Sequence, residues 1–436
     1  MNPPSSPLVA CHHCGSTFTS VDLERGETAS CDRCGSVLWR YSSLGLHHWL
    51  ALVIAAFFVF ITANAFPVAQ MGVREMVREA TLLDAVILTW QQGHEIVAVM
   101  TGLSGFVFPL TQLVLLLWVL IPMAASRPAP GFRVAMRILG LIRPWCMVPV
   151  FLLGVVVSVV KLAGMARVEP GIGLIAFGVL TVFLTMFSRL PPHAIWRYAE
   201  RHNIVPLHVP VPDKDEVLAG CHVCGQVQAL PHGESPETLH HCVRCNAVVH
   251  ARKPNHVART WALLIAAVVC YIPANLLPVM RIESLFGASE HTILGGVIEL
   301  WQTGGWDIAI IVFIASVVVP IFKLLALIVL LLGIQHENSE KLRAKTRLYE
   351  VVEFIGQWSM LDVFVVILLA ALANFHGLMQ IAAGAGAAAF GACVIFTMLA
   401  AMCFDPRRSW DLADDEPAEA PAPQTGASLA TTRPAS

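Results

Sequence analysis

The chain has 436 residues, of which 56% are hydrophobic and 13% are charged. Its mean hydropathy is +0.68, and its charged share is about half of the roughly 25% that is usual in soluble domains. These values exclude an ordinary soluble protein, and the formal net charge of −2 gives no support to a nucleic-acid-binding protein, whose domain would be basic.

The first element in chain order is a four-cysteine module over residues 1–45. It contains two Cys-x-x-Cys pairs separated by a loop, and a glycine, Gly15 or Gly35, directly follows each pair. A residue that adopts a left-handed conformation there turns backbone amides toward the thiolates, and four sulfurs then close a tetrahedral zinc site. Rubredoxin-type iron and redox-active cysteine pairs are the alternatives to structural zinc. The expected ligands are Cys11, Cys14, Cys31 and Cys34.

Residues 46–190 follow as a first transmembrane bundle. A helix needs about 20 apolar residues to cross the hydrocarbon core of a membrane, and this region holds four such stretches. The third and fourth are joined by only a few residues, which predicts a tight helical hairpin. The predicted spans cover residues 46–66, 94–124, 145–165 and 171–190.

A linker and a second four-cysteine module occupy residues 191–257, and a second bundle occupies residues 258–405. The module repeats the two pairs at nearly the same spacing, with Gly225 and Asn246 after them, so a second structural zinc ion is expected. The remaining residues, 406–436, are rich in Ala, Pro, Glu and Thr and are expected to be disordered. The second ligand set is Cys221, Cys224, Cys242 and Cys245, and the second set of spans covers residues 258–280, 306–335, 350–375 and 378–404.

The two halves are related by a nearly constant offset along the chain. Trp90 corresponds to Trp301, and Thr185 corresponds to Thr397. Self-similarity of this kind indicates an internal duplication. The sequence therefore predicts an all-α polytopic membrane protein with duplicated four-helix transmembrane bundles, each preceded by a small cytosolic four-cysteine zinc ribbon.

Basic residues indicate the orientation of the chain, because Lys and Arg concentrate in short cytoplasmic loops. The loops between the second and third spans and between the sixth and seventh spans are the basic ones, so both termini and both cysteine modules are expected in the cytosol. Residues 81–93 and 292–305 then lie on the opposite side, where we expect short interfacial helices. The basic residues are Arg127, Arg133, Arg137, Arg143, Lys341, Arg343, Lys345 and Arg347.

Two ionisable residues lie deep inside predicted spans of the second half. Lys323 precedes His336, at the cytosolic end of the sixth span, by between three and four helical turns. Asp362 follows Tyr349, at the cytosolic start of the seventh span, by the same interval. A rise of about 1.5 Å per residue puts both roughly 20 Å from the cytosolic face. Because a charge at that depth costs about 2.5–3.5 kcal/mol on insertion scales, each needs a partner or a function.

Hydroxyl groups on the sixth, seventh and eighth spans are expected close to this pair. One interpretation is a buried ion pair that locks the sixth span to the seventh; the other, which the added hydroxyls favour, is a polar cavity that lines a substrate or proton path. The first half has Gln112 and Pro149 at the equivalent positions, so only the second bundle is expected to be chemically active. The predicted site comprises Lys323, Asp362, Ser316, Ser359 and Thr397.

Several of these features together resemble the paraquat-inducible protein A family of bacterial inner membranes. They are the paired cysteine modules, the duplicated bundles, the Ala-Asn-x-x-Pro-Val sequences at 63–68 and 274–279, and the run Trp-Ser-Met-Leu-Asp-Val-Phe at 358–364. The resemblance covers nearly the whole chain apart from the tail. It implies an inner-membrane protein that exchanges lipids with a periplasmic MCE-domain partner, whose hydrophobic tunnel links the two membranes. It also implies that the eight ribbon cysteines are the metal ligands and that the family's intramembrane polar site is matched by Lys323, Asp362, Ser316, Ser359 and Thr397.

The sequence contains no Gly-Lys-Ser/Thr phosphate loop, no Gly-x-Ser-x-Gly elbow and no His-Glu-x-x-His motif, so we expect a protein that is not an enzyme. The main hypothesis is lipid transport: the second bundle takes a phospholipid from the bilayer, driven by proton transfer at Asp362 and Lys323, and passes it to the MCE tunnel. Two alternatives remain open. One is a redox or stress sensor in which an oxidant ejects zinc; the other is a transporter of small ions or metabolites.

Overall fold

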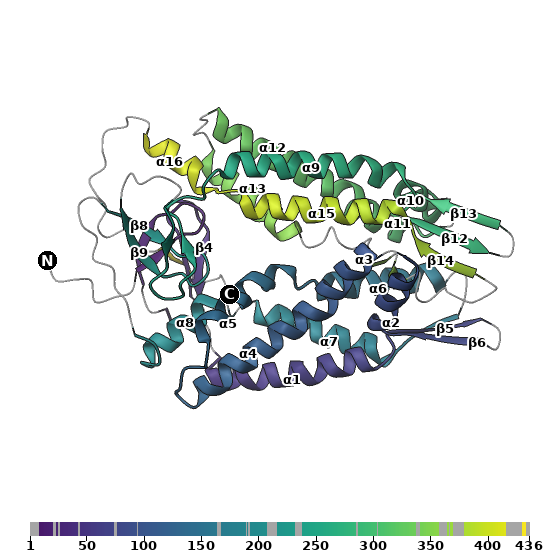
Figure 1. Cartoon of the computed structure of the whole chain (residues 1–436), viewed down its shortest axis with the longest axis horizontal. Coiled ribbons are helices and arrows are strands. Elements are labelled where there is room, and N and C mark those ends of the chain that lie inside the picture. Colours follow the sequence, from purple (N-terminus) through teal and green to yellow (C-terminus); the bar gives the residue numbers. More distant parts are fainter. Residues whose placement is uncertain are drawn as a thin grey trace.

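In the computed structural model, two helical bundles lie side by side, with the cysteine modules at one end and small β-sheets at the other (Figure 1). The prediction of a mostly helical, duplicated membrane protein is confirmed. The structure describes residues 8–20, 23–24, 27–41, 44–73, 76–93, 95–163, 167–188, 190, 192–206, 216–231, 238–284, 287–302, 304–336, 341–356, 364–365, 367–368, 379–415 and 430–432.

The first bundle is built on α1, which packs against α4 and α7, while α6 packs against α7. A single long helix runs from α3 through the π-helical segment η1 into α4. The described elements are α1 (Leu46–Ala65), α3 (Glu95–Gly102), η1 (Leu103–Val107), α4 (Phe108–Ala124), α6 (Val148–Ala163) and α7 (Ile172–Phe187).

The second bundle repeats this plan, with α9 packed along α15 and a long helix that runs from α11 through the π-helical segment η3 into α12. A further helix, α13, packs against α12 and α15. The described elements are α9 (His256–Leu276), α11 (Trp306–Phe313), η3 (Ile314–Val318), α12 (Val319–Gln335), α13 (Leu342–Gly356) and α15 (Ala385–Cys403).

Within the described residues, six helices are long and apolar enough to cross a membrane, and the bent pair of α7 and α8 (Pro192–Arg201) would make a seventh. The predicted seventh span, 350–375, begins within α13, but most of it after Gly356 lies outside the described residues. The expected total of eight spans therefore stays a prediction.

The short helices predicted for residues 81–93 and 292–305 are present as α2 (Leu82–Gln91) and α10 (Ile293–Gln302). A capping box begins α2, because the side chain of Thr81 accepts a hydrogen bond from the amide of Asp84 while the Asp84 carboxylate accepts one from the amide of Thr81. Both hydrogen bonds satisfy amides at the start of the helix, where the helix itself provides no acceptor.

Each bundle also ends in a three-stranded antiparallel sheet, which the sequence analysis did not predict. In each sheet the central strand directly follows the first helix of its half, and one neighbour is the other arm of a hairpin. The sheets are ordered β6-β5-β7 and β13-β12-β14. The strands are β5 (Ala69–Val73), β6 (Met76–Ala80), β7 (Arg167–Pro170), β12 (Met280–Ser284), β13 (Gly287–His291) and β14 (Met379–Ala383).

Glycines let the last helix of each half begin directly against the backbone that leaves the first helix. The amide of Gly386 donates to the carbonyl of Pro278 at 3.0 Å, as that of Gly173 does to Pro67 at 3.0 Å. A Cβ atom on Gly386 would lie 2.6 Å from the carbonyl oxygen of Leu277. Only glycine therefore fits at this position without a shift of the backbone.

The cysteine modules are pairs of short hairpins, and further helices lie beside them. α16 (Arg407–Asp415) and β15 (Ala430–Thr432) fall within the predicted disordered tail, so that expectation does not hold for their residues; residues 416–429 lie outside the described part. The remaining elements are β1 (Leu8–Ala10), β2 (Thr17–Thr19), β3 (Thr28–Ser30), β4 (Val37–Arg40), β8 (Glu216–Gly220), β9 (Val227–Pro231), β10 (His240–His241), β11 (Val248–Val249), β15 (Ala430–Thr432), α5 (Phe132–Ile142), η2 (Arg143–Trp145) and α16 (Arg407–Asp415).

Candidate functional site

The long helix that carries Lys323 widens into a π-helical turn shortly before that residue. Pro320 has no amide and its ring crowds the carbonyl of Ser316, four residues earlier, so a regular α-helical turn is unfavourable there. Ser316 is fully buried, and its hydroxyl donates to the carbonyl of Val312 at 2.6 Å. π-helical turns often occur at functional sites, and the same widening precedes Pro109 in the first half.

Lys323 lies where α12, α13 and α15 meet. Its side chain is 1% exposed, and its Nζ donates a hydrogen bond of 2.9 Å to the hydroxyl of Thr397 on α15. That hydroxyl donates in turn to the carbonyl of Val394 at 2.8 Å, which leaves its oxygen free to accept from the ammonium group. On the third side, a Cβ atom on Gly356 of α13 would lie 3.9 Å from Nζ.

Many of the described side chains packed near Lys323 are apolar. Buried side chains of α12, α13 and α15, among them Leu327, Val352 and Cys393, form one hydrophobic cluster with α9. Removing an ammonium group from water into such surroundings costs free energy that hydrogen bonds offset only in part. A lysine kept at this depth therefore indicates a functional position.

The structure brings two of the five predicted site residues together, Lys323 and Thr397. Ser316 lies on the same long helix as Lys323, and its hydroxyl bonds to its own helix. Asp362 and Ser359 lie outside the described residues, so their approach to Lys323 stays a prediction.

The equivalent positions in the first half differ in chemistry. Gln112 takes the place of Lys323 and is buried, at 4% exposed. Thr185 takes the place of Thr397, but it is exposed and its hydroxyl donates to the carbonyl of Thr181 in its own helix. Among the described residues, the hydrogen bond between a lysine and a threonine is thus a feature of the second bundle.

The structure fixes the end of α15 near the cysteine modules. Nζ of Lys253 donates to the carbonyls of Met402 and Phe404 at 2.6 and 2.8 Å, and the hydroxyl of Tyr349 donates to the carbonyl of Ala401 at 3.1 Å. Burial lowers the pKa of Lys253, and the carboxylate of Asp405 opposes that shift. These bonds hold the helix that presents Thr397.

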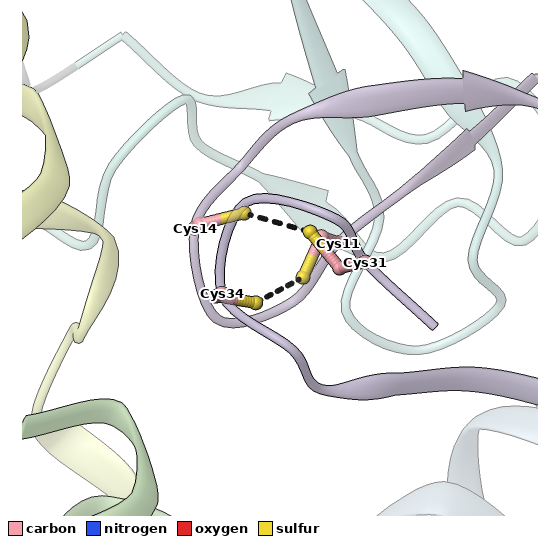
Figure 2. A group of neighbouring side chains, drawn as sticks. All are labelled: Cys11, Cys14, Cys31 and Cys34. Carbon is pink, nitrogen blue, oxygen red and sulfur yellow. Dashed lines mark hydrogen bonds between the residues drawn. The ribbon is translucent and has the colours of Figure 1, made fainter. Parts of the chain in front are cut away.

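Both predicted cysteine clusters are present, each able to hold a metal ion. In each cluster all four sulfur atoms are buried and lie within 4.8 Å of one another, and Figure 2 shows the first set converging on one point. A tetrahedral ion with bonds of about 2.3 Å would separate its sulfurs by about 3.8 Å. The Sγ pairs fit this geometry: Cys11 and Cys34 at 3.5 Å, Cys14 and Cys31 at 3.5 Å, Cys221 and Cys245 at 3.6 Å, and Cys224 and Cys242 at 3.6 Å.

The residues after the cysteine pairs adopt the left-handed conformation that the sequence predicts. Their φ angles are +81° at Gly15, +83° at Gly35, +74° at Gly225 and +58° at Asn246. Each of their amides donates to the carbonyl of the first cysteine of its pair, so the chain turns tightly around the sulfurs; the distance from Gly15 to Cys11 is 3.0 Å.

The first module, residues 8–41 (ribbon 1), contacts the second bundle. The guanidinium of Arg33, next to the last ligand Cys34, lies 5.0 Å from the ring centre of Trp410 on α16. Arg343 of α13 donates to the carbonyl of Arg33 at 3.0 Å, and His13 lies 3.7 Å from the carboxylate of Glu350. Ribbon 1 therefore touches α13, the helix whose last residue, Gly356, lies close to Lys323 of α12.

The second module, residues 216–250 (ribbon 2), makes the reciprocal contact with the first half. The guanidinium of Arg244, next to the last ligand Cys245, lies 4.7 Å from the ring centre of Trp196 on α8 and forms a buried ion pair with Glu200. Arg137 of α5 donates to the carbonyl of Asn246 at 3.3 Å.

The two ribbons also pack against each other, because β1 lies against β8 and β9. A Cβ atom on Gly220 would lie 2.7 Å from that of Ala10. Ribbon 1 also contacts its own half, where Arg197 of α8 lies 5.3 Å from the ring centre of Trp39. The ribbons thus join the two bundles through crossed contacts.

The sequence analysis did not find this crossed arrangement. A signal was present, since Arg33 and Arg244 stand at matching places in the two modules and Trp196 and Trp410 each follow the last helix of a half. The repeat pattern alone does not indicate which half of the chain each arginine contacts.

The family described as "Paraquat-inducible protein A" matches residues 46–200 and 257–414. The chain belongs to this family. Its two matched segments are the two transmembrane halves, and a cysteine cluster precedes each of them.

Curated relatives cover nearly the full length. The intermembrane transport protein PqiA of Escherichia coli strain K12 is 32% identical over 412 residues, which span 92% of this chain and 95% of that protein. The lipophilic envelope-spanning tunnel protein A of the same strain is 28% identical over 94% of this chain and 92% of its own length. A probable intermembrane transport protein of Haemophilus influenzae is 28% identical over 95% of this chain and 98% of its own length. No solved structure matches.

Proposed function

We propose that this protein is the inner-membrane component of a lipid transport system and moves phospholipid between the bilayer and a periplasmic MCE-protein tunnel. The names of its relatives support this proposal, because they describe intermembrane transport and an envelope-spanning lipophilic tunnel. On this proposal the chain is a transporter and not an enzyme, and both termini and both ribbons lie in the cytosol.

The observation that carries the proposal is the burial of Lys323 inside the second bundle, in hydrogen-bond contact with Thr397. A buried ammonium group attracts a phosphate headgroup more strongly than an exposed one, because the local dielectric constant is lower. We assign Asp362, Ser359 and Ser316 to the same polar site, with Asp362 and Lys323 exchanging the proton that couples transport. The lipid chains would stay among the apolar faces of α12, α13 and α15.

Zinc is the metal that we assign to the clusters, one ion to each. Four thiolates at tetrahedral spacing favour it, and a closed set of four ligands leaves no position for a reactive water. Bound zinc would supply folding free energy to the ribbons. The ribbons would then hold the cytosolic ends of the two bundles in register through the crossed arginine contacts.

The experiment is photolabelling of the purified full-length protein in vesicles that contain a phospholipid with a photoreactive acyl chain. Labelling of Leu325 and Val329, 56% and 55% exposed on α12, would report the surrounding bilayer. Labelling of Leu327, which is fully buried on the same helix, requires a lipid inside the bundle. The proposal predicts labelling of Leu327 that falls in Lys323→Met. Labels confined to the outward residues would refute a lipid path through this bundle.

A further inference from the structure

The first bundle contains a second feature with the chemistry of a ligand site, at the end near the ribbons. A cavity of about 260 Å³ lies between the last strand of ribbon 1, the first turn of α1, the last turn of α4 and α8. Its inner walls are apolar and buried, with Leu46 from α1, Leu120 and Met123 from α4, and Ile195 from α8.

The rim of this cavity is cationic. Arg40 from β4 and Arg197 and Arg201 from α8 all line it. Arg197 and Arg201 are four residues apart on one helix, so their charges are neighbours and repel each other. Among the described residues the cavity lining includes no Asp or Glu.

Aromatic side chains complete the rim. Trp39 lies beneath the guanidinium of Arg197 at 5.3 Å, and Tyr41, Trp49 and Tyr198 line the same space. Trp and Tyr favour the headgroup layer, where one part of the side chain is apolar and another is polar.

The position of the cavity matches the boundary between hydrocarbon and headgroups. α1 begins at Leu46 and α4 ends at Ala124, so the cavity lies level with the ends of two helices that we place across the membrane. At about 260 Å³ it is smaller than the roughly 300–1,000 Å³ that encloses a drug-sized ligand. It therefore suits a headgroup whose acyl chains extend into the bilayer, and not an enclosed lipid.

We infer that this cavity binds an anionic phospholipid of the leaflet next to the ribbons, with the phosphate between Arg197 and Arg201 and the first acyl carbons against Leu120 and Met123. The cationic rim favours an anion, and the apolar wall favours one that carries acyl chains. A free anion would make no apolar contact with that wall. The site is distinct from the one at Lys323, which lies in the other bundle, and its occupation does not depend on lipid transport.

Native mass spectrometry of the full-length protein tests the inference, with phosphatidylglycerol, phosphatidylethanolamine and glycerol 3-phosphate as separate probes. Wild-type protein should bind phosphatidylglycerol in preference to phosphatidylethanolamine. The double variant Arg197→Gln, Arg201→Gln should lose this preference by about 5- to 30-fold, since a basic residue near the membrane surface contributes about 1 kcal/mol toward an anionic lipid. The matched control is Arg127→Gln, Arg133→Gln, which removes the same charge from exposed positions and should keep the preference.

A second variant separates lost binding from lost folding, because Arg197 also packs on Trp39. Ala194→Trp fills the cavity from a partly exposed position of α8 and leaves all the arginines in place. It should weaken phosphatidylglycerol binding as well, with both metal ions retained. Unchanged preference in the arginine double variant, unchanged binding in Ala194→Trp, or displacement of the lipid by an equal concentration of glycerol 3-phosphate would each overturn the inference.

Discussion

Lys323 on α12 donates a hydrogen bond of 2.9 Å to the hydroxyl of Thr397 on α15, and neither side chain is more than 2% exposed. The bond joins two helices that are distant in sequence, at the same place where α13 brings Gly356 close to the ammonium group. This hydrogen bond is a part of the proposed site that single substitutions can test.

Replacing Thr397 by valine should destabilise the protein by about 1–3 kcal/mol, because a buried charged donor loses an acceptor while the shape of the side chain is kept. Thermal unfolding in detergent would measure the change. Thr185→Val is the matched control, since that hydroxyl is exposed and bonds to its own helix, and it should change stability by less than about 0.5 kcal/mol. Equal losses for the two variants would contradict a special role for Thr397.

Arg33 and Arg244 should differ in their contribution to stability although they occupy matching positions in the two ribbons. Arg244→Ala leaves the carboxylate of Glu200 buried without its partner and should cost about 3–5 kcal/mol. Arg33→Ala loses a stacking contact with Trp410 and should cost about 0.5–1 kcal/mol. Urea unfolding followed by tryptophan fluorescence would compare them. A larger loss for Arg33→Ala would show that the buried ion pair is not the stronger contact.

Loss of the metal ion from one ribbon should raise amide hydrogen exchange in the opposite half of the chain. Cys34→Ser should lower the metal content to one ion per chain and raise amide hydrogen exchange in α16, because ribbon 1 holds Trp410 through Arg33. Cys245→Ser should raise exchange in α8 and leave α16 protected. Metal analysis measures the number of ions per chain, and hydrogen-exchange mass spectrometry measures the protection of α8 and α16. Full protection of α16 in Cys34→Ser would contradict the crossed contacts.

Gly386→Ala should destabilise the second bundle by about 1–3 kcal/mol, because its Cβ atom would lie 2.6 Å from the carbonyl oxygen of Leu277. Gly178→Ala in α7 is the control, since a Cβ atom there meets nothing within 4 Å and alanine favours a helix by about 0.5–1 kcal/mol over glycine. The yield of folded protein and its melting temperature would separate the two. Similar behaviour of both variants would show that the close approach is absent.

The cysteine clusters could be predicted because their geometry is local. The spacing of the pairs and the residue after each one fix a tight turn, and Gly15 and Asn246 adopt the expected left-handed conformation. The approach of Lys323 to Thr397 was also expected from their depths, since both residues lie within about four helical turns of the end of a helix that runs toward the cysteine modules.

The arrangement of the ribbons could not be predicted in the same way. Arg33 and Arg244 each meet a tryptophan that is distant in sequence, and two equal repeats offer each arginine two equivalent partners. The small sheets were missed for another reason. Their strands are five residues or fewer and carry polar side chains such as Arg78 and Glu283, so no alternating apolar pattern marks them.

The most direct test of the central claim is lipid transfer from vesicles that contain the protein to its periplasmic tunnel partner. Lys323→Met keeps most of the length of the side chain and removes its charge. We predict that it lowers the transfer rate at least tenfold, whereas Gln112→Met, at the equivalent position of the first half, leaves the rate within about twofold of wild type. Undiminished transfer by Lys323→Met would contradict the claim that this buried lysine handles the lipid.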